Sequence, residues 1–223
     1  MAERKAHVER NTSETKIIVD LNLDGSGKYD IDTGIGFFDH MLNSFAKHGF
    51  FDLTCKVDGD LEVDCHHTIE DTGIVLGQAI REAVGDKKGI RRFGNFLLPM
   101  DETLVLGAVD LSGRPYCVCD LPFTVERVGG FDTEMVQEFF YAISYSAAMN
   151  LHLKLMHGSN KVMVDGFEIN KRRCLAEQDL YLAHIKNEHG MSYIDERQLA
   201  KIKNILTEKF VEHQYKTRSE EHT

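Results

Sequence analysis

The sequence of 223 residues contains no tryptophan, three prolines and five cysteines. The cysteines are odd in number and none of them forms a Cys-x-x-Cys pair, which argues against a disulfide framework and against a zinc site of that type. No segment approaches the roughly 18 consecutive apolar residues that a membrane-spanning helix needs. Residues 1–12 also lack the apolar stretch of a signal peptide. We therefore expect reduced thiols and a cytoplasmic protein.

Basic residues are also scarce, because 26 Lys and Arg stand against 36 Asp and Glu, a formal net charge of −10. A polyanion repels nucleic acid and anionic lipid on average, so we expect neither nucleic acid nor membrane as a partner. Histidine, in contrast, is frequent, with 11 copies in the chain. His40, His48, His66 and His67 lie within one short stretch, which makes that stretch the first place to look for chemistry.

The apolar pattern occurs twice along the chain. Alternating apolar residues on both sides of Asp24-Gly25 predict a β-hairpin over residues 14–31. Two successive β–β–α–β units of similar length predict an internal duplication. The expected fold class is α+β, with helices packed on one face of mainly antiparallel sheets. The expected elements are residues 14–31, 37–48, 53–63 and 68–84 in the first unit and residues 103–109, 116–121, 133–149 and 151–155 in the second.

The repeat also predicts the domain organisation. Residues 1–89 would form the first α+β half and residues 90–167 the second. Residues 168–223 have no alternating pattern and are predicted to form a charged helical tail. One face of this tail is apolar and would need a partner surface. Its apolar positions are Ile194, Leu199, Ile202, Ile205, Leu206 and Phe210.

The densest group of potential ligands is His66-His67-Thr68-Ile69-Glu70-Asp71. In a helix His66 and Glu70 share one face, and so do His67 and Asp71. Neutral imidazole plus carboxylate suits zinc, manganese or iron. His67 points about 100° away from His66 and would serve a second metal or contact the substrate. The alternative is a solvated helix start capped by acidic residues, and these residues alone leave both interpretations open.

Two further groups have both a functional and an ordinary interpretation. Asp39 beside His40 could fix the tautomer of the imidazole, or Asp39 could cap a helix whose first turn contains His40. Arg91, Arg92 and Arg114 are candidate anion binders because a guanidinium offers a planar fork of donors to phosphate oxygens. Isolated arginines are, however, mostly surface residues, so these patterns do not decide the function by themselves.

Six segments together resemble the imidazoleglycerol-phosphate dehydratase family of histidine biosynthesis, in their order and in their spacing. The resemblance runs from about residue 4 to about residue 160. The segments are DLNLDGSG at 20–27, GIGFFDHML at 34–42, HHTIEDTGIVLG at 66–77, IRRFG at 90–94, PMDE at 99–102 and DLSGRPY at 110–116.

The resemblance implies both a fold and an activity. The family fold consists of two copies of one half and is of the ribosomal protein S5 domain 2-like type. Each half is a four-stranded sheet with two helices on one face. The family enzyme is a homo-oligomeric shell of 24 subunits. It is a hydro-lyase that converts D-erythro-imidazole-glycerol phosphate, a small phosphate substrate, into imidazole-acetol phosphate. Two manganese ions at subunit interfaces are its cofactors.

The resemblance also implies metal ligands. One Mn²⁺ would take His40 and His67, and the other would take His66 and Glu70. Where the family has a histidine on a helix of the second half, this chain has Glu138, whose carboxylate can also ligate a metal.

The residues that would handle the substrate follow in the same way. Glu14 matches a glutamate of the family that contacts the substrate, and Arg92 and Arg114 match its phosphate-binding arginines. Glu14 is the predicted proton-transferring carboxylate, because a positioned acid or base must act at the side chain of the substrate. We predict Glu14, His67 and Glu70 as the catalytic residues.

The resemblance stops after Asn160. The family carries a second metal motif there, of the form G-x-N-x-H-H-x-x-E-A-x-F-K. In this chain Val162 and Met163 stand at the two histidine positions, and Gly166 stands at the glutamate position. By this comparison the chain lacks part of the ligand set of both metals, which lowers metal affinity.

Three explanations for this departure are open. The chain could be an altered dehydratase in which His152, His157, His184 or His189 substitutes for a lost ligand. It could be a catalytically impaired or non-catalytic relative that keeps the fold and the assembly. The reading frame could also be shifted locally after Asn160. A metal-dependent enzyme acting on another sugar phosphate is a further alternative.

Overall fold

The computed structural model of the chain describes residues 4–158, which form two similar halves. The first half comprises β1 (Lys5–Asn11), β2 (Thr15–Asn22), β3 (Tyr29–Asp32), α1 (Gly36–Gly49), β4 (Asp52–Gly59) and α2 (His66–Val84). The second half comprises β5 (Phe93–Met100), β6 (Thr103–Asp110), β7 (Tyr116–Asp120), β8 (Arg127–Val128), β9 (Phe131–Asp132), α3 (Met135–Ser146) and β10 (Asn150–His157).

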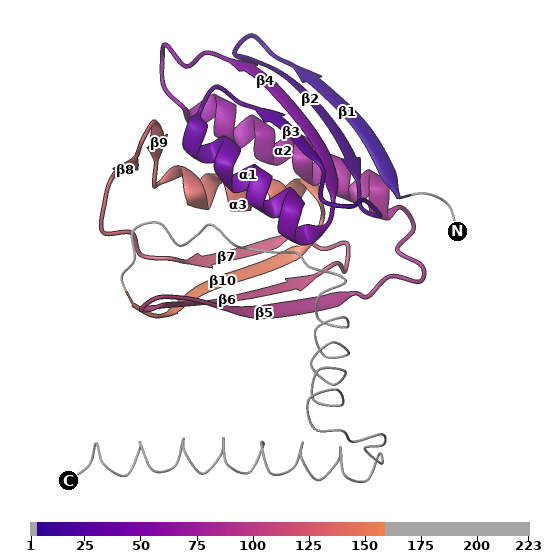
Figure 1. Cartoon of the computed structure of the whole chain (residues 1–223). Coiled ribbons are helices and arrows are strands. Elements are labelled where there is room, and N and C mark those ends of the chain that lie inside the picture. Colours follow the sequence, from indigo (N-terminus) through magenta and orange to yellow (C-terminus); the bar gives the residue numbers. More distant parts are fainter. Residues whose placement is uncertain (1–3, 159–223) are drawn as a thin grey trace, which may run out of the picture. The chain divides into compact units, whose positions relative to one another are not determined.

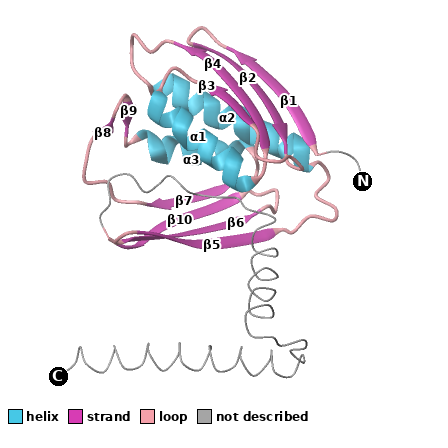
Figure 2. Ribbon diagram, in the orientation of Figure 1, coloured by secondary structure: helices cyan, strands magenta, loops and turns pink. Residues whose placement is uncertain are grey.

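The two four-stranded sheets have the same topology. Their strand orders are β1-β2-β4-β3 and β5-β6-β10-β7, and the last pair of each sheet is parallel while the other pairs are antiparallel. The helices lie between the two sheets and cover one face of each (Figures 1 and 2). This arrangement confirms the predicted duplication and the α+β class with mainly antiparallel sheets.

The hairpin predicted over residues 14–31 is wrong. β2 pairs with β1 and β4, whereas β3 crosses over and pairs in parallel with β4. The crossover is held at the start of β4, where Asp52 Oδ1 accepts hydrogen bonds from the backbone N–H groups of Ser26 at 2.8 Å and Lys28 at 3.1 Å. Alternating apolar residues identify a strand but not the strand with which it pairs.

Helices α2 and α3 join the two halves through close contact at two glycines. A Cβ at Gly73 would lie 2.9 Å from the carbonyl oxygen of Phe139, and a Cβ at Gly77 would lie 2.7 Å from that of Ile143. Because successive turns of α2 meet successive turns of α3, the helices run in the same direction. Their first turns therefore lie at the same end of the helix layer.

One hydrophobic core runs through both halves. Buried side chains of β2, such as Ile17 and Leu21, and of β10, such as Leu151 and Leu153, belong to the same cluster. The predicted boundary at residues 89–90 falls in the connection between α2 and β5. The predicted tail at 168–223 lies outside the described residues. No helix within residues 4–158 is long and apolar enough to cross a membrane.

Candidate metal and acid–base site

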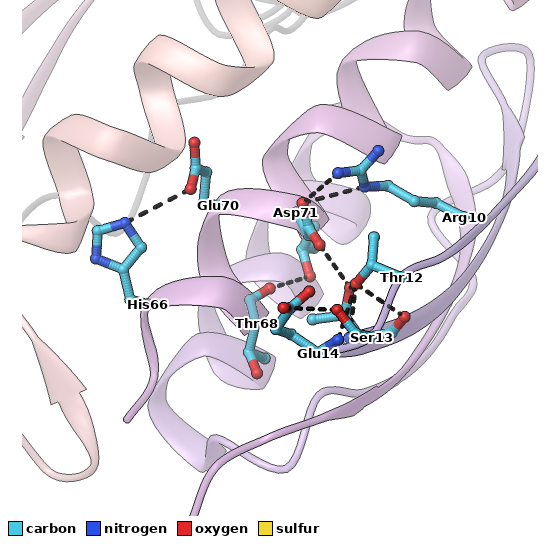
Figure 3. Close-up of polar contacts among 10 residues, drawn as sticks. Arg10, Thr12, Ser13, Glu14, His66, Thr68, Glu70 and Asp71 are labelled. Carbon is cyan, nitrogen blue, oxygen red and sulfur yellow. Dashed lines mark hydrogen bonds and ion pairs between the residues drawn. The ribbon is translucent and has the colours of Figure 1, made fainter. Parts of the chain in front are cut away.

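The predicted metal motif occupies the first turns of α2. His66 Nε2 lies 3.5 Å from Glu70 Oε2, and both side chains are about half exposed, at 46% and 42% (Figure 3). The rings of His66 and His67 have centroids 6.1 Å apart. The carboxylate of Asp64 accepts a hydrogen bond from the backbone N–H of His66 at 2.8 Å, so an acid-capped helix start and a paired histidine and glutamate occur together.

His67 is oriented by Asp60, which follows β4. Nδ1 of His67 donates to Asp60 Oδ2 at 3.0 Å. This hydrogen bond is the main reason that the pKa of His67 is raised. Because Nδ1 carries the proton, the lone pair of the neutral ring is on Nε2, which is the arrangement of a metal-ligating histidine with a carboxylate behind it. Sequence reasoning missed Asp60, because residues 53–63 were predicted to form a second hairpin. This prediction is wrong, since β4 ends at Gly59 and none of the described residues 60–65 before α2 forms a strand.

Glu14 lies in the turn between β1 and β2, next to His67. The backbone N–H of Asp60 donates to the carbonyl oxygen of Glu14 at 3.1 Å. The Ser13 hydroxyl donates to Glu14 Oε1 at 2.7 Å and is the main cause of the lowered pKa of Glu14, to which the charge of His67 also contributes. Glu14 is therefore an exposed, ionised carboxylate whose charge acts directly on that of His67.

His40 is the fifth residue of α1 and Glu138 is the fourth residue of α3, so both lie near the start of their helices. The carboxylate of Asp39 is held by the N–H and hydroxyl of Thr33, at 2.8 and 2.6 Å, so no contact to His40 accounts for its orientation. Glu138 lies at the same end of the helix layer as Glu70, because α2 and α3 run in the same direction. Within residues 4–158, no group of three or more His, Cys, Asp or Glu side chains is arranged to hold one metal ion.

The two predicted phosphate-binding arginines gather at Asp110, the last residue of β6. Arg92 binds both carboxylate oxygens of Asp110, at 2.6 and 3.0 Å, and its guanidinium lies 4.7 Å from the ring centroid of Phe93. This bidentate pairing is the first cause of the lowered pKa of Asp110, and Arg114 adds to it. Asp110 was not predicted as their common partner.

The arginines lie near the end of α2 that is opposite the histidines. Lys87 lies three residues after the end of α2, and its Nζ lies 3.6 Å from a Cβ placed at Gly113. Burial lowers the pKa of Lys87, and the charge of Asp110 acts in the opposite direction. The 19 residues of α2 span about 28 Å. One chain therefore places its histidines and its arginine pair too far apart for one small molecule to contact both.

Comparison with known proteins identifies similar sequences and folds. The sequence model of the imidazoleglycerol-phosphate dehydratase family matches residues 33–165. An imidazoleglycerol-phosphate dehydratase from Lachnoclostridium phytofermentans is 67% identical over 157 residues, which cover 70% of this chain and 80% of that protein. One from Cereibacter sphaeroides is 56% identical over 157 residues, with coverages of 70% and 80%.

Solved structures give the same result. The crystal structure of imidazoleglycerol-phosphate dehydratase from Staphylococcus aureus matches with a TM-score of 0.64 and 38% identity, over 70% of this chain and 86% of that chain. The crystal structure of the Pyrococcus furiosus protein matches with a TM-score of 0.62 and 34% identity, over 71% and 85%. Sequence and fold thus agree over most of each relative.

Proposed function

The chain belongs to the imidazoleglycerol-phosphate dehydratase family, and we propose on that premise how its residues carry out the reaction. The activity is the removal of water from imidazoleglycerol phosphate in histidine biosynthesis, a hydro-lyase reaction. The observation that carries the proposal for the site is the juxtaposition of Glu14 with His67, and of His66 with Glu70, at one end of α2.

The family is metal-dependent, and the residues at the start of α2 fit a divalent cation. A cation bound about 2.1 Å from each of two donors holds them about 3.0–3.5 Å apart at bond angles of roughly 90–110°. The separation of 3.5 Å between His66 Nε2 and Glu70 Oε2 agrees with this range. We propose Mn²⁺ as the metal, held by His66 and Glu70 at one site and by His67 and His40 at the other, with Glu138 as a further ligand. When bound, the metal supplies a Lewis acid that orients and polarises the imidazole ring of the substrate.

Glu14 is the proposed proton-transferring group. Dehydration removes a carbon-bound proton and a hydroxyl group from the glycerol side chain, and the proton needs an acceptor placed next to that carbon. A glutamate is ionised at neutral pH, and hydrogen bonding from Ser13 lowers the pKa of Glu14 further, so its carboxylate is in the form that can accept a proton. His67 lies beside it with Nδ1 fixed by Asp60.

The arginine pair supports a site completed by a second copy of the chain. Arg92 and Arg114 provide a fork of donors suited to the phosphate of the substrate. Because about 28 Å of α2 separates them from His66 and Glu14, a neighbouring subunit must supply one of the two groups to each substrate. The proposed enzyme is therefore a homo-oligomer, and the resemblance implies 24 subunits.

A second candidate is a catalytically impaired relative with the same fold and assembly. It would follow from the motif comparison made on the sequence, which aligns Val162 and Met163 with two histidines of the family motif. These residues and the predicted substitutes His184 and His189 lie outside the described residues. His152 and His157 lie on β10, in the sheet on the far side of α3 from α2.

A coupled assay for imidazole-acetol phosphate, run with and without added manganese, tests the proposal together with the metal content per subunit. The proposed enzyme turns over and binds about two ions, and His66→Ala loses metal and activity together. His7→Gln serves as the control, because His7 pairs with Asp20 at 2.7 Å, within the β1–β2 pair and outside the α2 motif. Metal binding without turnover would favour the impaired relative, and product without any bound metal would refute the site.

A further inference from the structure

A buried carboxylate next to the metal motif has no role in the site described so far. Asp71 follows Glu70 on α2 and is only 9% exposed. Its Oδ1 accepts a hydrogen bond from Arg10 Nε at 3.1 Å and forms an ion pair with Arg10 Nη2 at 3.0 Å, and its Oδ2 accepts a hydrogen bond from the Thr15 hydroxyl at 2.5 Å (Figure 3). All donors come from β1 and β2, so Asp71 fastens this strand pair to α2.

The strands β1 and β2 that Asp71 binds are joined by the turn that contains Glu14. The Thr12 hydroxyl accepts hydrogen bonds from the backbone N–H groups of Glu14 at 3.1 Å and Thr15 at 2.9 Å. Because the Thr15 hydroxyl donates to Asp71, it accepts from the Thr12 hydroxyl, 3.1 Å away. A continuous path of hydrogen bonds therefore leads from Asp71 through Thr15 and Thr12 to the backbone of Glu14.

The position of Asp71 on α2 gives this path its significance. Asp71 is four residues after His67 on the same helix, so the helix fixes the distance between the carboxylate of Asp71 and the imidazole of His67. Charge-assisted hydrogen bonds are roughly twice as strong as neutral ones, and the bond from Thr15 to Asp71 is shielded from water, while the one from Arg10 is partly buried. The turn can therefore move relative to His67 only by breaking this path, whose hydrogen bond between Thr15 and Asp71 is buried.

We propose that Asp71 is a positioning residue for the dehydratase reaction, which with Arg10 and Thr15 holds the carboxylate of Glu14 in place beside His67. This inference rests on the proposed function, in which Glu14 moves the proton. A carboxylate that only stabilises the hairpin would affect unfolding but not the rate of the chemical step. The two roles therefore differ in what they change.

Thr15→Val is the sharpest test, because it keeps the shape of a buried side chain, 2% exposed, and removes the hydroxyl donor of Asp71. Since a misplacement of about 1 Å can cost 10²-fold in rate, we expect kcat to fall about 10- to 100-fold. KM and metal content should stay within about twofold, because neither Arg92 nor His66 is disturbed. Thr15→Ser, which restores a hydroxyl, should recover most of kcat.

Thr72→Val is the matched control. Thr72 lies on α2 and, like Thr15, is buried. Its hydroxyl donates to the carbonyl oxygen of Thr68 at 2.6 Å, within the helix, rather than to Asp71 or the turn. This variant should leave kcat within about twofold. Asp71→Asn, which keeps the volume and removes the charge, should lower kcat in the same direction as Thr15→Val.

Amide hydrogen exchange provides a readout that does not depend on activity. Loss of the Thr15 hydroxyl should raise exchange at the Glu14 and Thr15 amides about 3- to 10-fold, the equivalent of one neutral hydrogen bond, and leave α2 unchanged. Unchanged exchange in the turn, or a kcat of Thr15→Val within twofold of the parent, would overturn the inference. If the parent makes no product, the proposed function fails, and the exchange result alone decides whether Asp71 holds the turn.

Discussion

Gly77 lies in close contact with α3, and adding one methyl group there tests how firmly the two halves are joined. A Cβ at position 77 would lie 2.7 Å from both the carbonyl oxygen of Ile143 and the Cβ of Ser146, and 3.0 Å from the backbone nitrogen of Ala147. Two of these three atoms are backbone and cannot rotate away. Gly77→Ala must therefore push the helices apart by roughly 0.7 Å or distort them locally.

Two opposing effects set the size of the change. Alanine favours an isolated helix over glycine by about 1 kcal/mol. Overpacking a core typically costs about 1–3 kcal/mol, and contact with backbone puts this site at the upper end. We expect Gly77→Ala to lower the free energy of unfolding by about 2 kcal/mol, which corresponds to a fall in Tm of about 4–8 °C.

Urea denaturation followed by far-ultraviolet circular dichroism, at one fixed protein concentration, measures this change. Gly36→Ala is the control, since a Cβ at this first residue of α1 would meet no atom within 4 Å. It should change stability by less than about 0.5 kcal/mol. A Gly77→Ala variant as stable as the parent, or more stable, would refute the close contact between the halves.

Three further outcomes follow from the same structure. Asp60→Ala removes the hydrogen bond that orients His67 and should weaken metal binding about 10- to 100-fold by isothermal titration; unchanged affinity would contradict that role. Arg92→Lys loses the bidentate contact with Asp110 that orients the guanidinium and should raise the KM for the phosphate substrate about 10-fold, with kcat less affected, in steady-state assays. The pKa of Asp52 is lowered, first by the backbone N–H of Ser26, so its contribution to stability is present above its unfolded pKa and is lost as the pH falls through the folded one. Asp52→Asn should therefore be less stable than the parent at pH 7, and denaturation curves should show the difference shrinking below about pH 4.

The fold illustrates which features can be predicted from local sequence. Residues 68–84 were expected as a helix from their apolar spacing, and α2 extends from His66 to Val84. The duplication was also predictable, because each half repeats the same order of periodicities. The pairing of β3 with β4 was not predictable, and the whole of β1 was missed, because pairing is decided by contacts between residues far apart in the chain.

The sequence by itself determined that His66 and Glu70 would share a helix face, because their spacing and the helix geometry are both local. Only the tertiary structure decided that Asp60 orients His67 and that Arg10 and Asp71, 61 residues apart, meet in a partly buried ion pair. It also decided that the arginines lie at the far end of α2 from the histidines. Side-chain chemistry and helical period depend only on neighbouring residues. These distances depend instead on how the sheets and helices pack, and residues from the whole chain contribute to that packing.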